Sequence, residues 1–204
     1  MAKKSAKKAS KKTAKKVTKK VAKKTAPVKK AAKKVAKKTP AKSAAKSAAP
    51  SPALPKVGSP APAFSLPCSQ NRTISLADFA GKTLVLYFYP RANTPGCTVE
   101  ACGFRDAIAS YGKINAHVLG VSPDPVKDVT KFATKFKLNF PLLADEHHAI
   151  CQAYGVWVQK SMYGKTYMGA ARTTFIIKNG LISHVIEKVS PDGHESEVLK
   201  LLSA

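Results

Sequence analysis

Residues 87–102 have the sequence Tyr87-Phe-Tyr-Pro-Arg-Ala-Asn-Thr-Pro-Gly-Cys-Thr-Val-Glu-Ala-Cys102, and we expect the rest of the chain to be organised around them. Its first residues end an apolar, β-prone run, Thr83 to Tyr89, which predicts a buried strand. Proline and glycine residues then predict a loop. From Cys97 onward, apolar side chains recur at intervals of three and four residues, which predicts a helix that continues to about Ala109. A strand, a short loop and a helix are therefore expected in immediate succession.

Cys97 lies at the start of this helix, where backbone N–H groups have no partner within the helix and the positive end of the macrodipole is near. That position favours a thiolate over a thiol. Arg91 and Arg105 bring further positive charge nearby in the sequence. The alternative is that Cys97 is a small buried hydrophobic residue, but the loop chemistry before it favours a reactive thiol.

The spacing Pro90-x-x-x-Thr94-x-x-Cys97 resembles the active-site signature of the peroxiredoxin family, and the longer run to Cys102 is similar to its bacterioferritin comigratory protein (PrxQ) branch. The resemblance extends from about Leu54 to Leu202. The further matching segments are Val118-Leu-Gly-Val-Ser122, Asn139-Phe-Pro-Leu-Leu-Ala-Asp145, Tyr154-Gly-Val-Trp157, Gly164-Lys-Thr-Tyr167 and Arg172-Thr-Thr-Phe-Ile-Ile177. The resemblance implies an α/β, thioredoxin-like fold, in which helices flank a central mixed sheet.

The resemblance also implies the chemistry. The enzyme would be a thioredoxin-dependent peroxidase that reduces hydrogen peroxide and organic hydroperoxides, without a cofactor or a metal ion. In this atypical two-cysteine scheme, Cys97 is the peroxidatic cysteine and Cys102 is the resolving cysteine, and the two form an intramolecular disulfide. The family suggests a monomer.

Four further residues receive roles from the same resemblance. Thr94 offers its hydroxyl to the thiolate or to the peroxide, and Pro90 shields the pocket from water. Arg172, at the start of a predicted strand, supplies a fixed positive charge that favours the thiolate and orients the peroxide. Glu100 either holds Arg172 or is a first-turn acid favoured by the helix dipole alone.

Cys102 lies five residues beyond Cys97, and a regular helix separates two such Cα atoms by about 8.6 Å. A disulfide needs a Cα separation of about 4.4–6.8 Å. The bond therefore requires the first turns of the helix to unwind, and Gly103 lowers the cost of unwinding. Unwinding also exposes the disulfide to a reductant such as thioredoxin.

Charge is distributed unevenly along the 204 residues, which carry 36 Lys+Arg and 11 Asp+Glu for a formal net charge of +25. Residues 1–50 contain 20 lysines and no acidic residue, whereas the remainder has a net charge of only +5. No apolar run is long enough for a transmembrane helix, and the N-terminus lacks the apolar region of a secretory signal. We therefore expect a cytoplasmic protein with one globular domain and a cationic arm.

The arm, residues 1–55, repeats Ala-Lys-Lys with little apolar surface, and we expect it to be disordered. It resembles the lysine-rich tails of H1-type histones and bacterial histone-like proteins. Lysines of this kind contact nucleic-acid phosphates without base specificity, and they would associate the protein with a nucleoid or chromatin. Representative candidates are Lys7, Lys8, Lys15, Lys16, Lys33 and Lys34. A solubility tail, an organellar or nuclear address, and adhesion to acidic lipids are the alternatives.

Residues 56–204 form the expected thioredoxin-like domain. Extended residues 57–66 and 72–76 predict a hairpin, and Asn179-Gly180 predicts a second hairpin between strands 173–177 and 181–186. Residues 116–121 predict a buried strand, and a short strand ends at Leu143. The remaining predicted helices cover residues 125–136, with Asp124 as cap, residues 146–154 and residues 195–202.

Two cysteines lie outside the signature. Cys151 is expected to pack within a helix, and Cys68 to be a surface thiol. A zinc site is disfavoured because no Cys-x-x-Cys pair exists. His147 and His148 are expected on a helix surface, and Trp157 in the core or a pocket wall.

Two functional hypotheses follow from the arm and the domain together. The first is a thiol peroxidase whose arm contacts nucleic acid. The second is a nucleic-acid-associated redox sensor, in which the same site regulates instead of scavenging. A thiol-disulfide oxidoreductase is disfavoured because the Cys-x-x-Cys pair is missing.

Overall fold

A computed structural model of the chain describes residues 53–162 and 164–203. The lysine-rich arm, with the disorder and the nucleic-acid contacts expected of it, lies outside the described residues apart from its last three positions.

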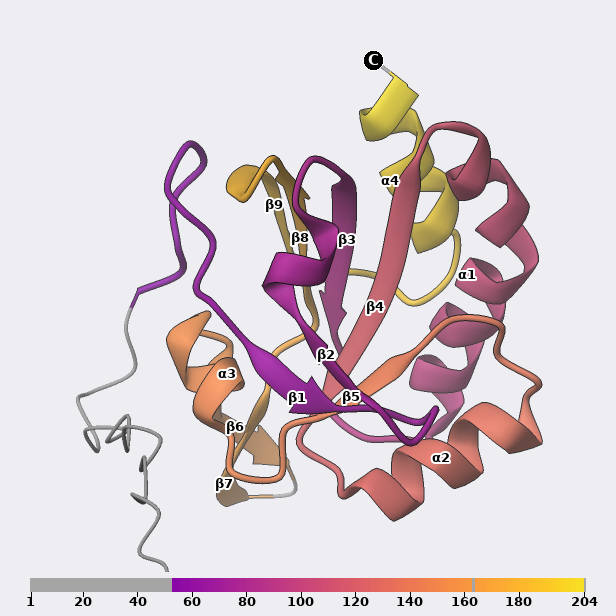
Figure 1. Cartoon of the computed structure of the whole chain (residues 1–204). Coiled ribbons are helices and arrows are strands. Elements are labelled where there is room, and N and C mark those ends of the chain that lie inside the picture. The colour runs from indigo at the N-terminus through magenta and orange to yellow at the C-terminus, as the bar shows by residue number, and fades with distance from the viewer. Residues whose placement is uncertain (1–52, 163, 204) are drawn as a thin grey trace, which may run out of the picture. The chain divides into compact units, whose positions relative to one another are not determined.

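The strand β3 (Thr83–Phe88) occupies the middle of a five-stranded sheet with the order β5-β4-β3-β8-β9 (Figure 1). It pairs in parallel with β4 (Ala116–Ser122) and antiparallel with β8 (Thr173–Lys178). The strand β5 (Leu142–Ala144) continues the parallel half, and β9 (Leu181–Glu187) continues the antiparallel half. The expectation of a central mixed sheet is therefore confirmed.

Three helices cover one face of this sheet: α1 (Pro95–Lys113), α2 (Val126–Lys135) and α4 (His194–Ser203). The other face carries α3 (Ala149–Ala153) and the short hairpin of β1 (Ser65–Pro67) and β2 (Thr73–Ser75), followed by the 3-10 helix η1 (Leu76–Phe79). A separate hairpin joins β6 (Trp157–Met162) to β7 (Lys165–Ala170).

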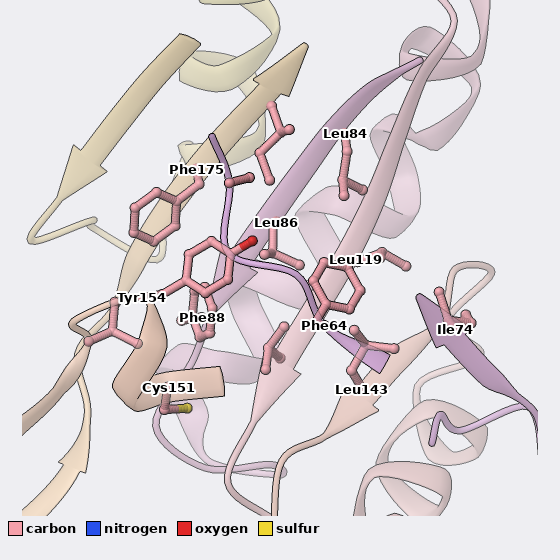
Figure 2. Close-up of a cluster of buried hydrophobic side chains, with 14 of the residues drawn as sticks. Phe64, Ile74, Leu84, Leu86, Phe88, Leu119, Leu143, Cys151, Tyr154 and Phe175 are labelled. Carbon is pink, nitrogen blue, oxygen red and sulfur yellow. The ribbon is translucent and has the colours of Figure 1, made fainter. Parts of the chain in front are cut away.

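Alternation along β3 divides the core into two clusters, because successive strand residues point to opposite faces. Leu84, Leu86 and Phe88 pack toward α3 and the β1–β2 hairpin, in the cluster of Figure 2. Val85 and Tyr87 pack toward the helices, where Tyr87 stacks on Phe104 of α1 with ring centroids 4.8 Å apart. Both faces of the central strand are thus buried, as the continuous apolar run predicted.

The helix boundaries differ from the predicted ones. The helix α1 begins at Pro95, two residues before Cys97, because proline is preorganised for the first helical position, and it continues to Lys113. The helix α3 is shorter than the predicted 146–154, since His148 adopts a left-handed conformation (φ 58°) just before it.

Asp124 does not cap α2, so that prediction was wrong. Its carboxylate accepts hydrogen bonds from Ala92 N and Ser122 Oγ, both at 2.6 Å. The helix begins at Val126, whose N–H is bound instead by Glu146 Oε1 at 3.1 Å. Asp124 therefore makes a long-range hydrogen bond to Ala92 in place of a capping bond to α2. This bond connects the start of α2 to the loop before Cys97.

Both predicted hairpins are present: β1 pairs antiparallel with β2, and β8 with β9 across Asn179-Gly180. The β6–β7 hairpin was not predicted from the sequence. Its outer strand is mostly exposed, so it has no alternation of buried and exposed residues to detect.

Candidate active site

The N-terminus of α1 fixes the position of Cys97. Thr94 occupies the N-cap, and its carbonyl accepts bonds from Thr98 N at 2.9 Å and Thr98 Oγ1 at 2.8 Å. Cys97 is the third residue of the helix and only 1% exposed. Cys97 therefore belongs to the first turn of the helix, the end at which the helix dipole favours negative charge.

Arg172 reaches this sulfur from the junction between β7 and β8. Its Nη2 donates to Cys97 Sγ at 3.3 Å, and its Nη1 donates to Glu100 Oε2. The Arg172 side chain is 16% exposed and that of Glu100 is fully buried. The planar guanidinium thus contacts the thiol through one amino group and a buried carboxylate through the other.

Glu100 is held in a strongly desolvated position. Burial raises the pKa of Glu100 to about 7, and the Arg172 guanidinium acts in the opposite direction. Among the described residues, none forms a hydrogen bond with Glu100 Oε1, nor with the buried hydroxyls of Tyr87 and Tyr89. Burial also raises the pKa of both tyrosines far above their usual range, so they remain neutral donors.

Thr94 and Pro90 flank the thiol along the chain. Pro90 is half-buried just after β3. The Thr94 hydroxyl donates to the Arg91 carbonyl at 3.0 Å, so in this conformation its proton points to the loop backbone. The loop between them is held by the bond from Ala92 N to Asp124 and by Lys135 Nζ, which donates to Asn93 Oδ1 at 2.7 Å.

Arg91 and Arg105, the two arginines near Cys97 in sequence, make their contacts elsewhere than with its sulfur. Arg105 pairs with Asp106 at 2.8 Å and donates to the Phe136 carbonyl. Arg91 is exposed and lines a cavity of about 610 Å³ beside the loop. Arg172, distant in sequence, is the arginine that contacts the thiol.

All four cysteines of the chain lie in its described part, and each is a free thiol. Cys102 is half-buried in α1, the same helix as Cys97. Cys151 is buried in α3 and its N–H donates a hydrogen bond to Asp145 Oδ2 at 2.7 Å, and burial raises the pKa of its thiol strongly. Cys68 is fully buried in the core, so the expectation of a surface thiol was wrong.

The first turns of α1 are also contacted by the segment that leads into α4. A Cβ on Gly96 would lie 3.2 Å from Pro191 Cγ, and one on Gly103 would lie 2.5 Å from Glu195 Oε2. Tyr111 Oη donates to the Glu195 carbonyl at 2.7 Å. This segment, residues 191–195, therefore packs closely along the helix that carries both Cys97 and Cys102.

His194 anchors this segment, and no sequence pattern predicted that role. The imidazole is buried, lies edge-on to Phe104, and its Nε2 is 2.8 Å from Thr174 Oγ1. Burial lowers the pKa of His194, which keeps the ring neutral at physiological pH.

Two other predictions concern the histidines expected at a helix surface and the disfavoured zinc site. His148 is half-buried and stacks on Trp157 with ring centroids 4.0 Å apart, so it is not simply a helix-surface residue. Within residues 53–162 and 164–203, no cluster of three or more His, Cys, Asp or Glu side chains could hold a metal ion.

This arrangement is that of a thiol enzyme on an α/β scaffold, and comparison with known proteins agrees. The sequence profile of the AhpC/TSA family matches residues 57–185. A peroxiredoxin Bcp of Coxiella burnetii, described as putative, is 48% identical over 145 residues, which cover 71% of this chain and 96% of the relative. Peroxiredoxin Bcp of Escherichia coli K12 is 45% identical over 148 residues, which cover 72% and 95%.

Solved structures show the same fold. Peroxiredoxin Q of Xanthomonas campestris superposes with a TM-score of 0.66 at 38% identity, covering 69% of this chain and 89% of that one. A mutant PrxQ of Xylella fastidiosa superposes with a TM-score of 0.69 at 35% identity, covering 72% and 95%. The chain therefore belongs to the AhpC/TSA family and is a peroxiredoxin similar to the Bcp and PrxQ proteins. The predictions of a thioredoxin-like fold and of a thioredoxin-dependent peroxiredoxin are confirmed at the level of fold and enzyme class.

The described helices include none whose length and apolarity would suffice for a membrane span.

Proposed function

We propose that Cys97 is the peroxidatic cysteine, that Cys102 is the resolving cysteine, and that a thioredoxin-type dithiol regenerates the enzyme. The observation that carries this proposal is the bond of 3.3 Å from Arg172 Nη2 to Cys97 Sγ. A guanidinium in contact with a buried sulfur favours its anionic form, which is the nucleophile that attacks a peroxide.

In the first step the Cys97 thiolate attacks one peroxide oxygen, the O–O bond breaks, and the departing oxygen leaves as an alkoxide or hydroxide that takes up a proton. Cys97 is oxidised to a sulfenic acid. Arg172 and the N–H groups of the first helical turn stabilise the negative charge that moves from sulfur to the leaving oxygen. Thr94 orients the peroxide through its hydroxyl after releasing the Arg91 carbonyl, and Pro90 shields the site from water.

In the second step the Cys102 thiol condenses with the sulfenic acid, which forms the disulfide and releases water. The separation of about 8.6 Å between the two Cα atoms in a regular helix exceeds the range of a disulfide. The start of α1 must therefore unwind, which also detaches it from residues 191–195. A thioredoxin-type dithiol then reduces the exposed disulfide and is itself oxidised.

The test is peroxide consumption coupled to NADPH through thioredoxin and its reductase. Cys97→Ser should abolish turnover. Cys102→Ser should retain a single oxidation of Cys97 but lose turnover with thioredoxin, whereas Cys68→Ser should behave as wild type. Mass spectrometry of the oxidised protein should identify a Cys97–Cys102 disulfide, and a Cys97–Cys68 disulfide in its place would refute the assignment.

We also propose that the lysine-rich arm contacts nucleic acid through phosphates. Its support is compositional: 20 lysines without one acidic residue in residues 1–50. Binding of this kind weakens steeply with salt, because each phosphate contact releases a counterion. A DNA mobility shift that disappears on deletion of residues 1–52, while peroxidase activity persists, would support the proposal. If oxidation changed the affinity for DNA, the redox-sensor hypothesis would be favoured.

A further inference from the structure

A second cationic side chain lies close to Arg172. Lys160 belongs to β6, and its Nζ donates to the Ala170 carbonyl at 2.6 Å. Its aliphatic stem crosses the neighbouring strand, since a Cβ on Gly169 would lie 3.7 Å from Lys160 Cδ. The side chain is half-buried and points along the hairpin toward the junction that carries Arg172.

Lys160 and Arg172 line the same cavity of about 290 Å³, together with the apolar side chains of Leu54 and Val158. Ala170, whose carbonyl binds the Lys160 ammonium, lies two residues before Arg172, and the intervening Ala171 donates its N–H to Val156 O at 2.7 Å. The β6–β7 hairpin therefore holds the segment from which Arg172 extends to Cys97.

The charges around this segment explain why two cations tolerate each other. Burial lowers the pKa of Lys160, the Arg172 charge lowers it further, and negative charge on Cys97 acts in the opposite direction. Arg172 also contacts Glu100. Negative charge on the Cys97 sulfur would therefore stabilise both cations.

We propose that Lys160 is a positioning residue of the peroxidase site, which fixes the strand junction before Arg172 and adds a second positive charge that favours the Cys97 thiolate. The inference rests on the proposed role of Cys97 as the peroxidatic residue. It assigns to the β6–β7 hairpin a part in the oxidation step, and none in the resolution step.

The test compares three substitutions in a Cys102→Ser background, where only the oxidation step occurs. Lys160→Met removes both charge and hydrogen bond, Lys160→Gln retains an N–H donor without charge, and Lys160→Arg retains both. We expect Met and Gln to slow peroxide oxidation of Cys97 by about tenfold, as the loss of one nearby half-buried charge implies, and Arg to restore most of the rate. Alkylation of Cys97 by iodoacetamide should follow the same order.

Lys165→Met is the matched control, because Lys165 is an exposed lysine on the partner strand β7. It should react as the parent does, and thermal unfolding identifies any variant that fails to fold. A Gln variant with the parent's rate would overturn the proposed action of charge. A parent protein whose Cys97 is not oxidised by peroxide would instead overturn the proposed function, so the two failures are distinguishable.

Discussion

Arg172 and Glu100, 72 residues apart in sequence, form a buried ion pair whose cation also contacts the sulfur of Cys97. The Glu100 carboxylate binds Nη1 of the guanidinium and thereby directs Nη2 toward the Cys97 thiol. The helix that carries Cys97, the proposed nucleophile, thus also carries the residue that orients the arginine beside it, because Cys97 and Glu100 are separated by less than one helical turn.

Arg172→Lys should lower the rate of Cys97 oxidation by about 100-fold, although it conserves charge. An ammonium cannot form two parallel contacts from one plane, and the loss of one fixed donor typically costs about this much. Rapid-mixing measurements with hydrogen peroxide provide the rate. Arg91→Lys is the control, because Arg91 is exposed in the same loop. An Arg172→Lys rate equal to that of the parent and of Arg91→Lys would show that a positive charge is sufficient and that the planar guanidinium is not required.

Glu100→Gln should change how stability depends on pH. The folded-state pKa of Glu100 is raised from its ordinary value of 4.5 to about 7. Between these values the native protein retains a proton that the unfolded chain has released, so the wild type loses stability as pH rises through this window. The Gln variant lacks this contribution. Urea unfolding of the reduced proteins at several pH values measures it, and parallel curves for the two proteins would contradict the prediction.

Gly103→Ala should slow disulfide formation by about fivefold. Alanine stabilises a helix over glycine by about 1 kcal/mol, and this cost is added to unwinding. The new methyl group displaces only the end of the flexible Glu195 side chain. Gly112→Ala, in the last turn of the same helix with no atom within 4 Å of the added Cβ, is the control. Quenched-flow trapping of free thiols gives the rate, and a slowing equal to that of Gly112→Ala would refute local unwinding.

Gly120→Ala should destabilise the protein by about 1–3 kcal/mol, the usual cost of overpacking a core. A Cβ there would lie 2.7 Å from Leu142 Cδ2 and from the ring of Tyr87, both within the packed cluster beneath the helices. Chemical unfolding measures the change. An unchanged free energy of unfolding would mean that Leu142 and Tyr87 can move aside to accommodate the added methyl group.

The central strand and the first helix were predictable because their signals are local. The apolar run at β3 is continuous, and proline residues mark the break that follows it, although Pro95 and Gly96 form the first turn of α1 and not the loop that was predicted. The contact between Arg172 and Cys97 is not local, and only resemblance to a family indicated it. Asp124 was wrongly predicted to cap the helix that follows it. Its hydrogen-bond partner, Ala92, lies 32 residues away, and such a contact is not visible in the local sequence.

Lys160 and His194 could not be recognised from sequence. The lysine lies in a polar hairpin without periodic apolar residues, and the histidine begins a helix whose burial depends on packing against Phe104 and Thr174. Burial converts such ordinary surface residue types into parts of a site, and it depends on contacts between segments far apart in the chain.

Because Cys97 and Cys102 both lie in α1, a disulfide between them and the regular helix exclude each other. If oxidation joins these sulfurs as proposed, amide hydrogen exchange along residues 95–103 would report it, and a partner that binds only the unwound segment would respond to oxidation without contacting either sulfur.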